Sequence, residues 1–174
     1  PAEVTVAKPE QRKVTLYMEV TGSTAPINRV DLVARVQGFL DKVGYKDGAA
    51  VKKGDLLFQI DKEDYEIALQ IAEAAVVQQE ALLLQANADL KRKQDLVKTA
   101  AVSVAMLDES RAKRDSTQAA LAQAKGQVEQ AKRNLAYTTI LAPFNGVVSK
   151  RLVDPGAMVG AGSPTKLATI VQID

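Results

Sequence analysis

A long stretch of this chain is almost free of glycine and proline, and this feature constrains the fold most. Of the 10 Gly, only Gly126 lies between Lys62 and Ala142, and none of the 6 Pro does. These two residues most often interrupt helices and strands, so their absence over such a length predicts helix. The sequence on either side contains the remaining glycines and the prolines, and we expect strands and turns there.

Apolar residues in this stretch recur at alternating steps of three and four, which is the heptad pattern of a coiled coil. On the first arm they are Leu69, Ala72, Val76, Leu83, Ala86, Leu90 and Val97, interrupted by Gln79 and Lys93. On the second arm they are Leu107, Leu121, Ala124, Val128, Ala131 and Leu135, interrupted by Ser110, Arg114 and Thr117. We expect a helix over 62–98, a turn over 99–102 and a helix over 103–136, packed as an antiparallel hairpin. A first arm of roughly 36 residues would reach about 54 Å at 1.5 Å per residue.

The flanking segments contain an internal repeat. The stretch Ala34-Arg-Val-Gln-Gly38 matches Ala142-Pro-Phe-Asn-Gly146, and two more glycines follow in each copy at the same intervals. The matched turn glycines are Gly38, Gly48 and Gly54 in the first copy, and Gly146, Gly156 and Gly162 in the second. Neither copy can bury its apolar face alone, so we expect 28–61 and 137–174 to pack together as one small β-sandwich. The predicted fold class is α+β, a split β-domain with the hairpin inserted in it.

Composition excludes several kinds of chemistry. Without Cys or His, the chain cannot form a Cys/His zinc site, a disulfide or a Ser-His-Asp triad. The acidic cluster Glu63, Asp64 and Glu66 opens the first predicted helix, where acids are favoured by the helix dipole. A net charge of +2 and 4% aromatic residues argue against binding to nucleic acid. We predict no enzymatic activity, no cofactor and no metal site, and we find no window with the roughly 18 uninterrupted apolar residues of a membrane span.

Three segments carry a resemblance to a known family. The stretches Val36–Leu40 and Val51–Asp61 resemble the first half of a lipoyl or biotinyl carrier domain, and Asn134–Gly146 resembles the entry to its second half. A helical hairpin inserted between such halves is the arrangement of the membrane fusion proteins, the periplasmic adaptors of tripartite efflux pumps, here of the RND type. The resemblance implies an adaptor between an inner-membrane transporter and a TolC-type outer-membrane channel. It also implies about six copies in the assembly, and a place in the periplasm of a Gram-negative bacterium with an inner-membrane anchor outside this chain.

A further match lies at the predicted hairpin tip. Adaptors that dock on TolC-type channels carry Arg, Leu and Ser at the spacing of Arg92, Leu96 and Ser103. The resemblance implies that Arg92 bonds polar groups of the channel, that Leu96 packs against it and that Ser103 adds a hydrogen bond. Alternatively, Arg92 is a solvated charge and Ser103 is simply the N-cap of the second helix. The capping box is incomplete, because Met106 stands where Glu or Gln would complete it.

The N-terminal segment 1–27 contains an alternating run over Lys13–Val20, which predicts a strand. In the resembled family this segment connects to the membrane-proximal and β-barrel domains. Those domains are built mostly from sequence beyond the second half, so we expect an incomplete barrel here.

Three other functions compete with the adaptor. The dipeptide Asp61-Lys62 resembles the modification site of a lipoyl or biotinyl carrier domain of an enzyme complex, but a long helix follows where the carrier has a tight turn. A plain structural coiled coil does not account for the β-repeat. Within the adaptor family, an ABC-type exporter is the alternative to the RND partner.

Overall fold

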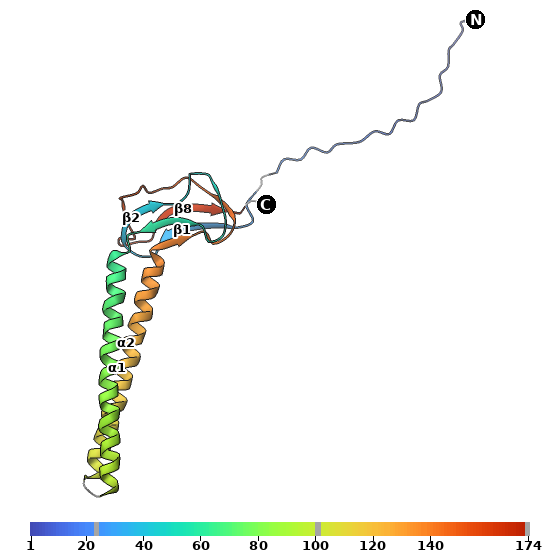
Figure 1. Cartoon of the computed structure of the whole chain (residues 1–174). Coiled ribbons are helices and arrows are strands. Elements are labelled where there is room, and N and C mark those ends of the chain that lie inside the picture. Colours follow the sequence, from blue (N-terminus) through green and yellow to red (C-terminus); the bar gives the residue numbers. More distant parts are fainter. Residues whose placement is uncertain (23–24, 100–101, 173–174) are drawn as a thin grey trace.

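The computed structural model describes residues 1–22, 25–99 and 102–172. A small β-domain sits at one end of a two-helix hairpin that projects away from it (Figure 1). In chain order the elements are β1 (Arg29–Ala34), β2 (Gly38–Val43), β3 (Ala50–Val51), β4 (Leu56–Ile60), α1 (Glu63–Lys98), α2 (Val104–Tyr137), β5 (Thr139–Leu141), β6 (Gly146–Val148), β7 (Met158–Val159) and β8 (Thr165–Val171). This arrangement is the predicted α+β class, with the hairpin inserted between β4 and β5.

The β-domain consists of two four-stranded sheets, ordered β1-β8-β6-β3 and β5-β4-β2-β7. Exchanging each strand of the first half for its counterpart in the second (β1 for β5, β2 for β6, β3 for β7, β4 for β8) converts one order into the other. The internal repeat of the sequence is therefore a pseudo-twofold axis of the domain. Each sheet takes two strands from each copy, so the copies interlock and neither forms a sheet by itself.

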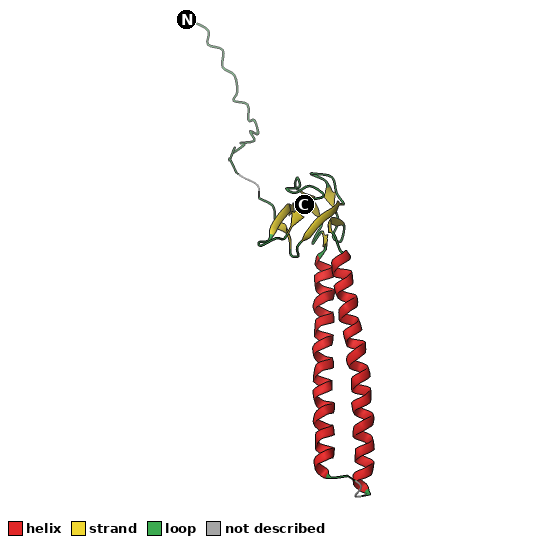
Figure 2. Ribbon diagram, turned by 90° about the vertical axis from the view of Figure 1, so that its left-hand side faces the viewer, coloured by secondary structure: helices red, strands yellow, loops and turns green. Residues whose placement is uncertain are grey.

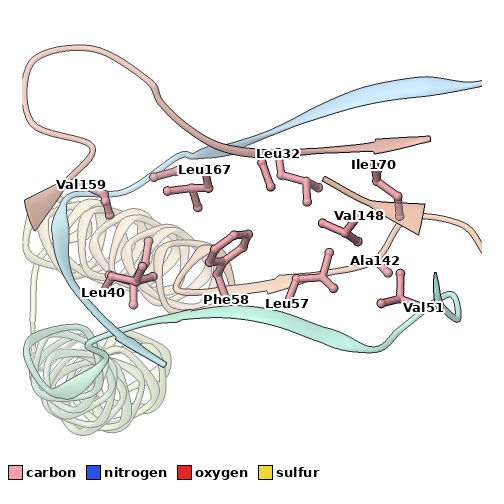
Figure 3. Close-up of a cluster of buried hydrophobic side chains, with 13 residues drawn as sticks. Leu32, Leu40, Val51, Leu57, Phe58, Ala142, Val148, Val159, Leu167 and Ile170 are labelled. Atoms are coloured by element: carbon pink, nitrogen blue, oxygen red, sulfur yellow. The ribbon is translucent and has the colours of Figure 1, made fainter. Parts of the chain in front are cut away.

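The core of the β-domain lies between the two sheets (Figure 3). Phe58 is fully buried there, and the Tyr45 ring packs against it edge-on at 5.4 Å between ring centroids. The other apolar residues with less than 2% exposed surface come from both halves of the repeat and are Ala34, Leu40, Leu57, Ile60, Val148, Val159, Leu167, Ala168 and Ile170. Burial of this surface is the main force that holds the interlocked strands together.

The hairpin helices lie side by side along their length (Figure 2). Every residue of the predicted seam is buried or half-buried, the five polar residues included. α1 begins at Glu63, with Glu63, Asp64 and Glu66 in its first turn as predicted. α2 begins at Val104 and ends at Tyr137, one residue later at each end than expected.

The N-terminal prediction was wrong in one respect. Residues 1–22 contain no strand, and all of them are exposed, including Val14, Leu16 and Val20 of the alternating run. A strand requires a hydrogen-bonded neighbour, and an isolated one is not stable in water. Figure 1 shows this segment extending away from the β-domain, so the alternating pattern finds no partner within the described chain.

Candidate interaction site at the hairpin tip

The tip is the end of the hairpin opposite the β-domain (Figure 1). α1 ends at Lys98, and the Thr99 hydroxyl closes its last turn by donating to the Leu96 carbonyl oxygen at 2.9 Å. α2 begins at Val104, directly after Ser103. Residues 100 and 101 of the predicted turn 99–102 lie outside the described residues, so the two helix ends define the site.

Arg92 lies on the solvent side of α1, and its side chain is 70% exposed. Its guanidinium forms an ion pair with Asp89 one turn earlier on the same helix. One turn closer to the tip, Lys98 Nζ lies 2.8 Å from Asp95 Oδ1, and this contact lowers the pKa of Asp95 below its ordinary value. Because a guanidinium carries five N–H donors, the bond to Asp89 leaves Arg92 able to bind a second partner.

Ser103 is the N-cap of α2. Its backbone is extended (φ −78°, ψ 154°), and its Oγ accepts from the Met106 backbone N–H at 3.4 Å, a long hydrogen bond. The capping role weighed for Ser103 in the sequence is thus present in the structure. The side chain is also exposed, and a hydroxyl has one donor and two acceptor positions, so capping leaves Ser103 able to bond another molecule.

Two exposed apolar residues at the tip were missed by the sequence analysis. Leu96 is 44% exposed, as a contact residue should be, and across the turn Val104 is 63% and Met106 44% exposed. The first turn of α2 contains no acidic residue, although acids there stabilise a helix. The incomplete capping box at Met106 was the available signal, because a local rule broken at an exposed position often marks a functional site.

The six repeat glycines serve the fold in two different ways. Four of them lie in turns with positive φ, namely Gly48 (77°), Gly54 (91°), Gly156 (88°) and Gly162 (74°). Gly38 and Gly146 instead open strands β2 and β6, so describing them as turn residues was incorrect. At Gly146 an added Cβ would collide with the Val171 carbonyl oxygen, so close approach of β8 requires glycine there.

Lys62, the residue that resembles a carrier-domain modification site, occupies the N-cap position of α1. Its Nζ lies 2.7 Å from Glu66 Oε1, and this contact raises the pKa of Lys62. A carrier domain presents its lysine on a tight strand-to-strand turn, whereas here the chain continues directly into a 36-residue helix. Within the described residues, no three acidic side chains converge on a point that could hold a metal ion.

Over residues 28–171 the sequence matches the family described as RND MFP, barrel-sandwich hybrid domain, where MFP denotes membrane fusion protein. The chain belongs to this family. The match spans both halves of the β-domain and the whole hairpin, so the membrane fusion protein fold and the resemblance inferred from the sequence are confirmed.

Two curated relatives are similar over nearly the whole chain. Multidrug resistance protein MdtA of Proteus mirabilis is 33% identical over 171 residues, which cover 98% of this chain and 42% of that protein. The efflux pump periplasmic linker BepD of Brucella suis is 34% identical over 175 residues, covering 100% of this chain and 44% of that protein. This chain therefore spans less than half the length of these relatives.

Solved membrane fusion protein structures share the fold. MacA from Actinobacillus actinomycetemcomitans aligns with a TM-score of 0.71 and 30% sequence identity, over 84% of this chain and 50% of that one. A MacA-MexA chimeric protein containing the Pseudomonas aeruginosa MexA α-hairpin aligns with a TM-score of 0.61 and 34% identity, over 85% of this chain and 49% of that one. In both, the region matched by this chain is about half of the structure.

Proposed function

We propose that this chain is the adaptor region that connects an inner-membrane RND transporter to a TolC-type outer-membrane channel, in the periplasm of a Gram-negative bacterium. The names of the relatives support this proposal, since MdtA is a multidrug resistance protein and BepD an efflux pump periplasmic linker. The adaptor acts by contact and performs no chemistry. The observation that carries the proposal is the hairpin tip, where exposed apolar side chains and an exposed arginine stand at the end of a long spacer.

The tip offers both kinds of contact that a channel surface needs. Leu96, Val104 and Met106 provide apolar area from the two helix ends, and Arg92 and Ser103 provide hydrogen-bonding groups beside it. An apolar centre with polar groups at its edge is the usual composition of a protein–protein interface. Met106 also costs the helix a capping interaction, and docking on a partner explains why an apolar residue stands at this position.

The outer face of α1 supports self-association of the adaptor. By length and composition alone α1 is apolar enough to cross a membrane, yet it is paired with α2, and Glu80 of α1 lies 3.6 Å from Lys125 of α2 in an ion pair. Outside the seam with α2, Val77 is 66% and Leu84 73% exposed, and their spacing of seven residues places them on one face of α1. Large exposed apolar residues on one face favour a protein interface, and we assign this face to a neighbouring hairpin.

The charges of the two helices indicate how the neighbours are oriented. Every charged residue between Glu63 and Leu90 on α1 is acidic. On the adjoining part of α2 the basic residues Lys113, Arg114, Lys125, Lys132 and Arg133 outnumber the acidic residues Asp115 and Glu129. Contact of α1 with α1 of a second copy would bring acidic residues together, and contact of α1 with α2 would bring opposite charges together. Head-to-tail contacts of this kind form a ring when the rotation between neighbours closes, and we propose such a ring, of about six copies, for the assembly.

Substitutions at Met106 in the full-length protein test docking. Met106→Gln completes the capping box and removes apolar area, so we expect hairpin stability to be maintained or raised while capture of the channel falls by about tenfold. Met106→Leu keeps the apolar area and should bind normally. Arg92→Glu and Leu96→Ser should also reduce capture and drug efflux without unfolding the hairpin. Co-purification with the channel and drug susceptibility are the measurements, and normal capture by Met106→Gln, Arg92→Glu and Leu96→Ser together would refute tip docking.

Cysteine cross-linking tests the contact between neighbours, because the chain has no native Cys. Ala122 and Gly126 are exposed on α2 next to Lys125, at the level of Glu80 and Val77 on α1. A mixture of Val77→Cys and Ala122→Cys proteins should form mixed disulfide dimers in preference to either homodimer. Predominance of the Val77→Cys homodimer would contradict the head-to-tail arrangement.

A further inference from the structure

The base of the hairpin is built into the β-domain. The chain leaves β4 at Ile60 and returns from α2 at Thr138, and the Ile60 backbone N–H donates to the Thr138 carbonyl oxygen at 2.8 Å. Thr138 is fully buried. Backbone hydrogen bonding alone therefore fixes the two ends of the hairpin to each other and to the same sheet.

Gln59 on β4 extends this connection into the last turn of α2. Its Nε2 donates to the Ile60 carbonyl oxygen at 2.9 Å and also lies 3.3 Å from the Thr138 carbonyl oxygen and 3.4 Å from Thr138 Oγ1. Its Oε1 accepts from Thr139 Oγ1 at 3.1 Å. Thr138 Oγ1 in turn donates to the Leu135 carbonyl oxygen at 2.7 Å. The hydroxyl of Thr138 thus lies between the Gln59 amide on the sheet and the Leu135 carbonyl oxygen of the helix, to which it donates.

The connection between β1 and β2, which joins the two sheets, contacts both helices. The Tyr65 hydroxyl, near the start of α1, donates to the Gln37 carbonyl oxygen at 2.7 Å. The Arg35 guanidinium lies 5.3 Å from the ring centroid of Tyr137, the last residue of α2, at cation–π distance. Between them, Val36 is supported by Gly160 (φ 73°), where an added Cβ would collide with the Val36 carbonyl oxygen. Gly160 therefore packs closely against the connection, which contacts α1 through Gln37 and α2 through Arg35.

We propose that Arg35, Gln37, Gln59, Tyr65 and Tyr137 form a base clamp, which fixes the angle between the hairpin and the β-domain. Each helix has its own attachment, so the clamp resists tilting in more than one direction. The hairpin is a long lever: a tilt of about 10° at the base moves a tip about 54 Å away by roughly 9 Å. These are positioning residues, and only the consequence for efflux rests on the proposed adaptor function.

Distance measurement between two spin labels tests the clamp on the chain alone. Gln85 on α1 and Lys150 in the β-domain are exposed, and cysteine at both positions gives a single labelled pair because native Cys is absent. The parent protein should give one narrow distance distribution. The double variant Tyr65→Phe/Tyr137→Leu removes one attachment from each helix and should broaden the distribution about twofold. The matched control Tyr137→Phe keeps the ring under Arg35 and should leave the width unchanged.

Melting curves from circular dichroism show whether the variants fold. If the double variant is unstable, Tyr65→Phe removes a single oxygen atom and serves in its place, with a smaller but measurable broadening expected. An unchanged width in folded variants would overturn the clamp. No channel or transporter is present in this measurement, so an unchanged width would contradict the base clamp without bearing on tip docking. Conversely, normal channel capture by the tip variants would contradict tip docking without bearing on the base clamp.

Discussion

The β-domain and the hairpin bury their apolar residues to different degrees. In the β-domain Leu57, Phe58 and Ile170 have no exposed surface at all. In the hairpin the most buried apolar residues retain some exposure, from 5% at Ala124 to 8% at Leu90. Two interlocked sheets enclose a core on both sides, whereas two helices can share only one seam. The hairpin therefore depends less on its own interior and leaves more apolar surface for neighbours.

The seam itself becomes more polar toward the tip. Ser110 and Thr117 are buried in it. The Ser110 hydroxyl donates to the Met106 carbonyl oxygen, and the Thr117 hydroxyl donates to the Lys113 carbonyl oxygen, in each case one turn earlier on α2. These bonds satisfy groups that would otherwise destabilise the interface. Arg114 is less well matched, because its buried Nε lies 3.1 Å from Asp115 Oδ1 without hydrogen-bond geometry. The distal hairpin should accordingly be the least stable part of the helix pair.

Removal of the largest core side chain should have the greatest effect. Phe58→Ala deletes a fully buried ring that also contacts Tyr45, and we expect the free energy of unfolding to fall by about 3–5 kcal/mol. Phe39→Ala is the control on a neighbouring strand, because Phe39 is 56% exposed and should cost less than about 1 kcal/mol. Denaturant unfolding of the isolated chain measures both. Equal losses would show that the β-domain is not held by the enclosed core.

The seam can be tested with two adjacent leucines. Leu83 is half-buried in the seam and Leu84 is 73% exposed. Leu83→Asp should destabilise the hairpin by about 1–3 kcal/mol, because it places a charge without a partner against α2. In the isolated chain Leu84→Asp should change stability by less than about 0.5 kcal/mol. Thermal melting followed by the helical circular dichroism signal distinguishes the two variants. If both variants melted at the same lowered temperature, Leu84 would have to contact α2 as Leu83 does.

The seam and the repeat were visible in the sequence because both are periodic. A period of 3.5 placed the polar residues Gln79, Lys93 and Thr117 in the seam along with the apolar ones, and four glycines with positive φ lie where the repeat puts turns. The exchange of strands between the two halves was not predictable, because pairing depends on contacts far apart in the chain. Val104 was not predicted as a contact residue because the exposure of a single residue at a helix end leaves no periodic pattern in the sequence.

Substitution of Gly126 tests whether α2 behaves differently in the monomer and in an assembly of several copies. It is exposed in the middle of α2, and an added Cβ would meet no atom within 4 Å. Gly126→Ala should therefore stabilise the isolated hairpin by about 0.8–1 kcal/mol, the difference in helix propensity. The reverse change one turn away, Ala122→Gly, should destabilise it by a similar amount. A loss of stability in monomeric Gly126→Ala protein would reveal a contact within the chain, whereas reduced cross-linking between copies would indicate a close approach by a neighbour.

The smallest expected effect concerns the edge of the β-domain. Asp31 on β1 accepts from Lys166 Nζ and from Thr169 Oγ1 on β8, both at 2.8 Å, and the bond from Lys166 is the main cause of its lowered pKa. A carboxylate whose pKa is lowered by folding stabilises the protein above its ordinary pKa of 3.8, and this contribution is lost as the pH falls through the folded value. Asp31→Asn should slightly reduce the melting temperature at neutral pH and make its decline shallower between about pH 5 and about pH 2. Asp41→Asn is the control, since its nearest cation, Lys42, is 3.8 Å away on the same strand. Melting curves across this pH range measure the difference, and an acid decline in Asp31→Asn as steep as in the parent would exclude the β1–β8 ion pair as a source of acid sensitivity.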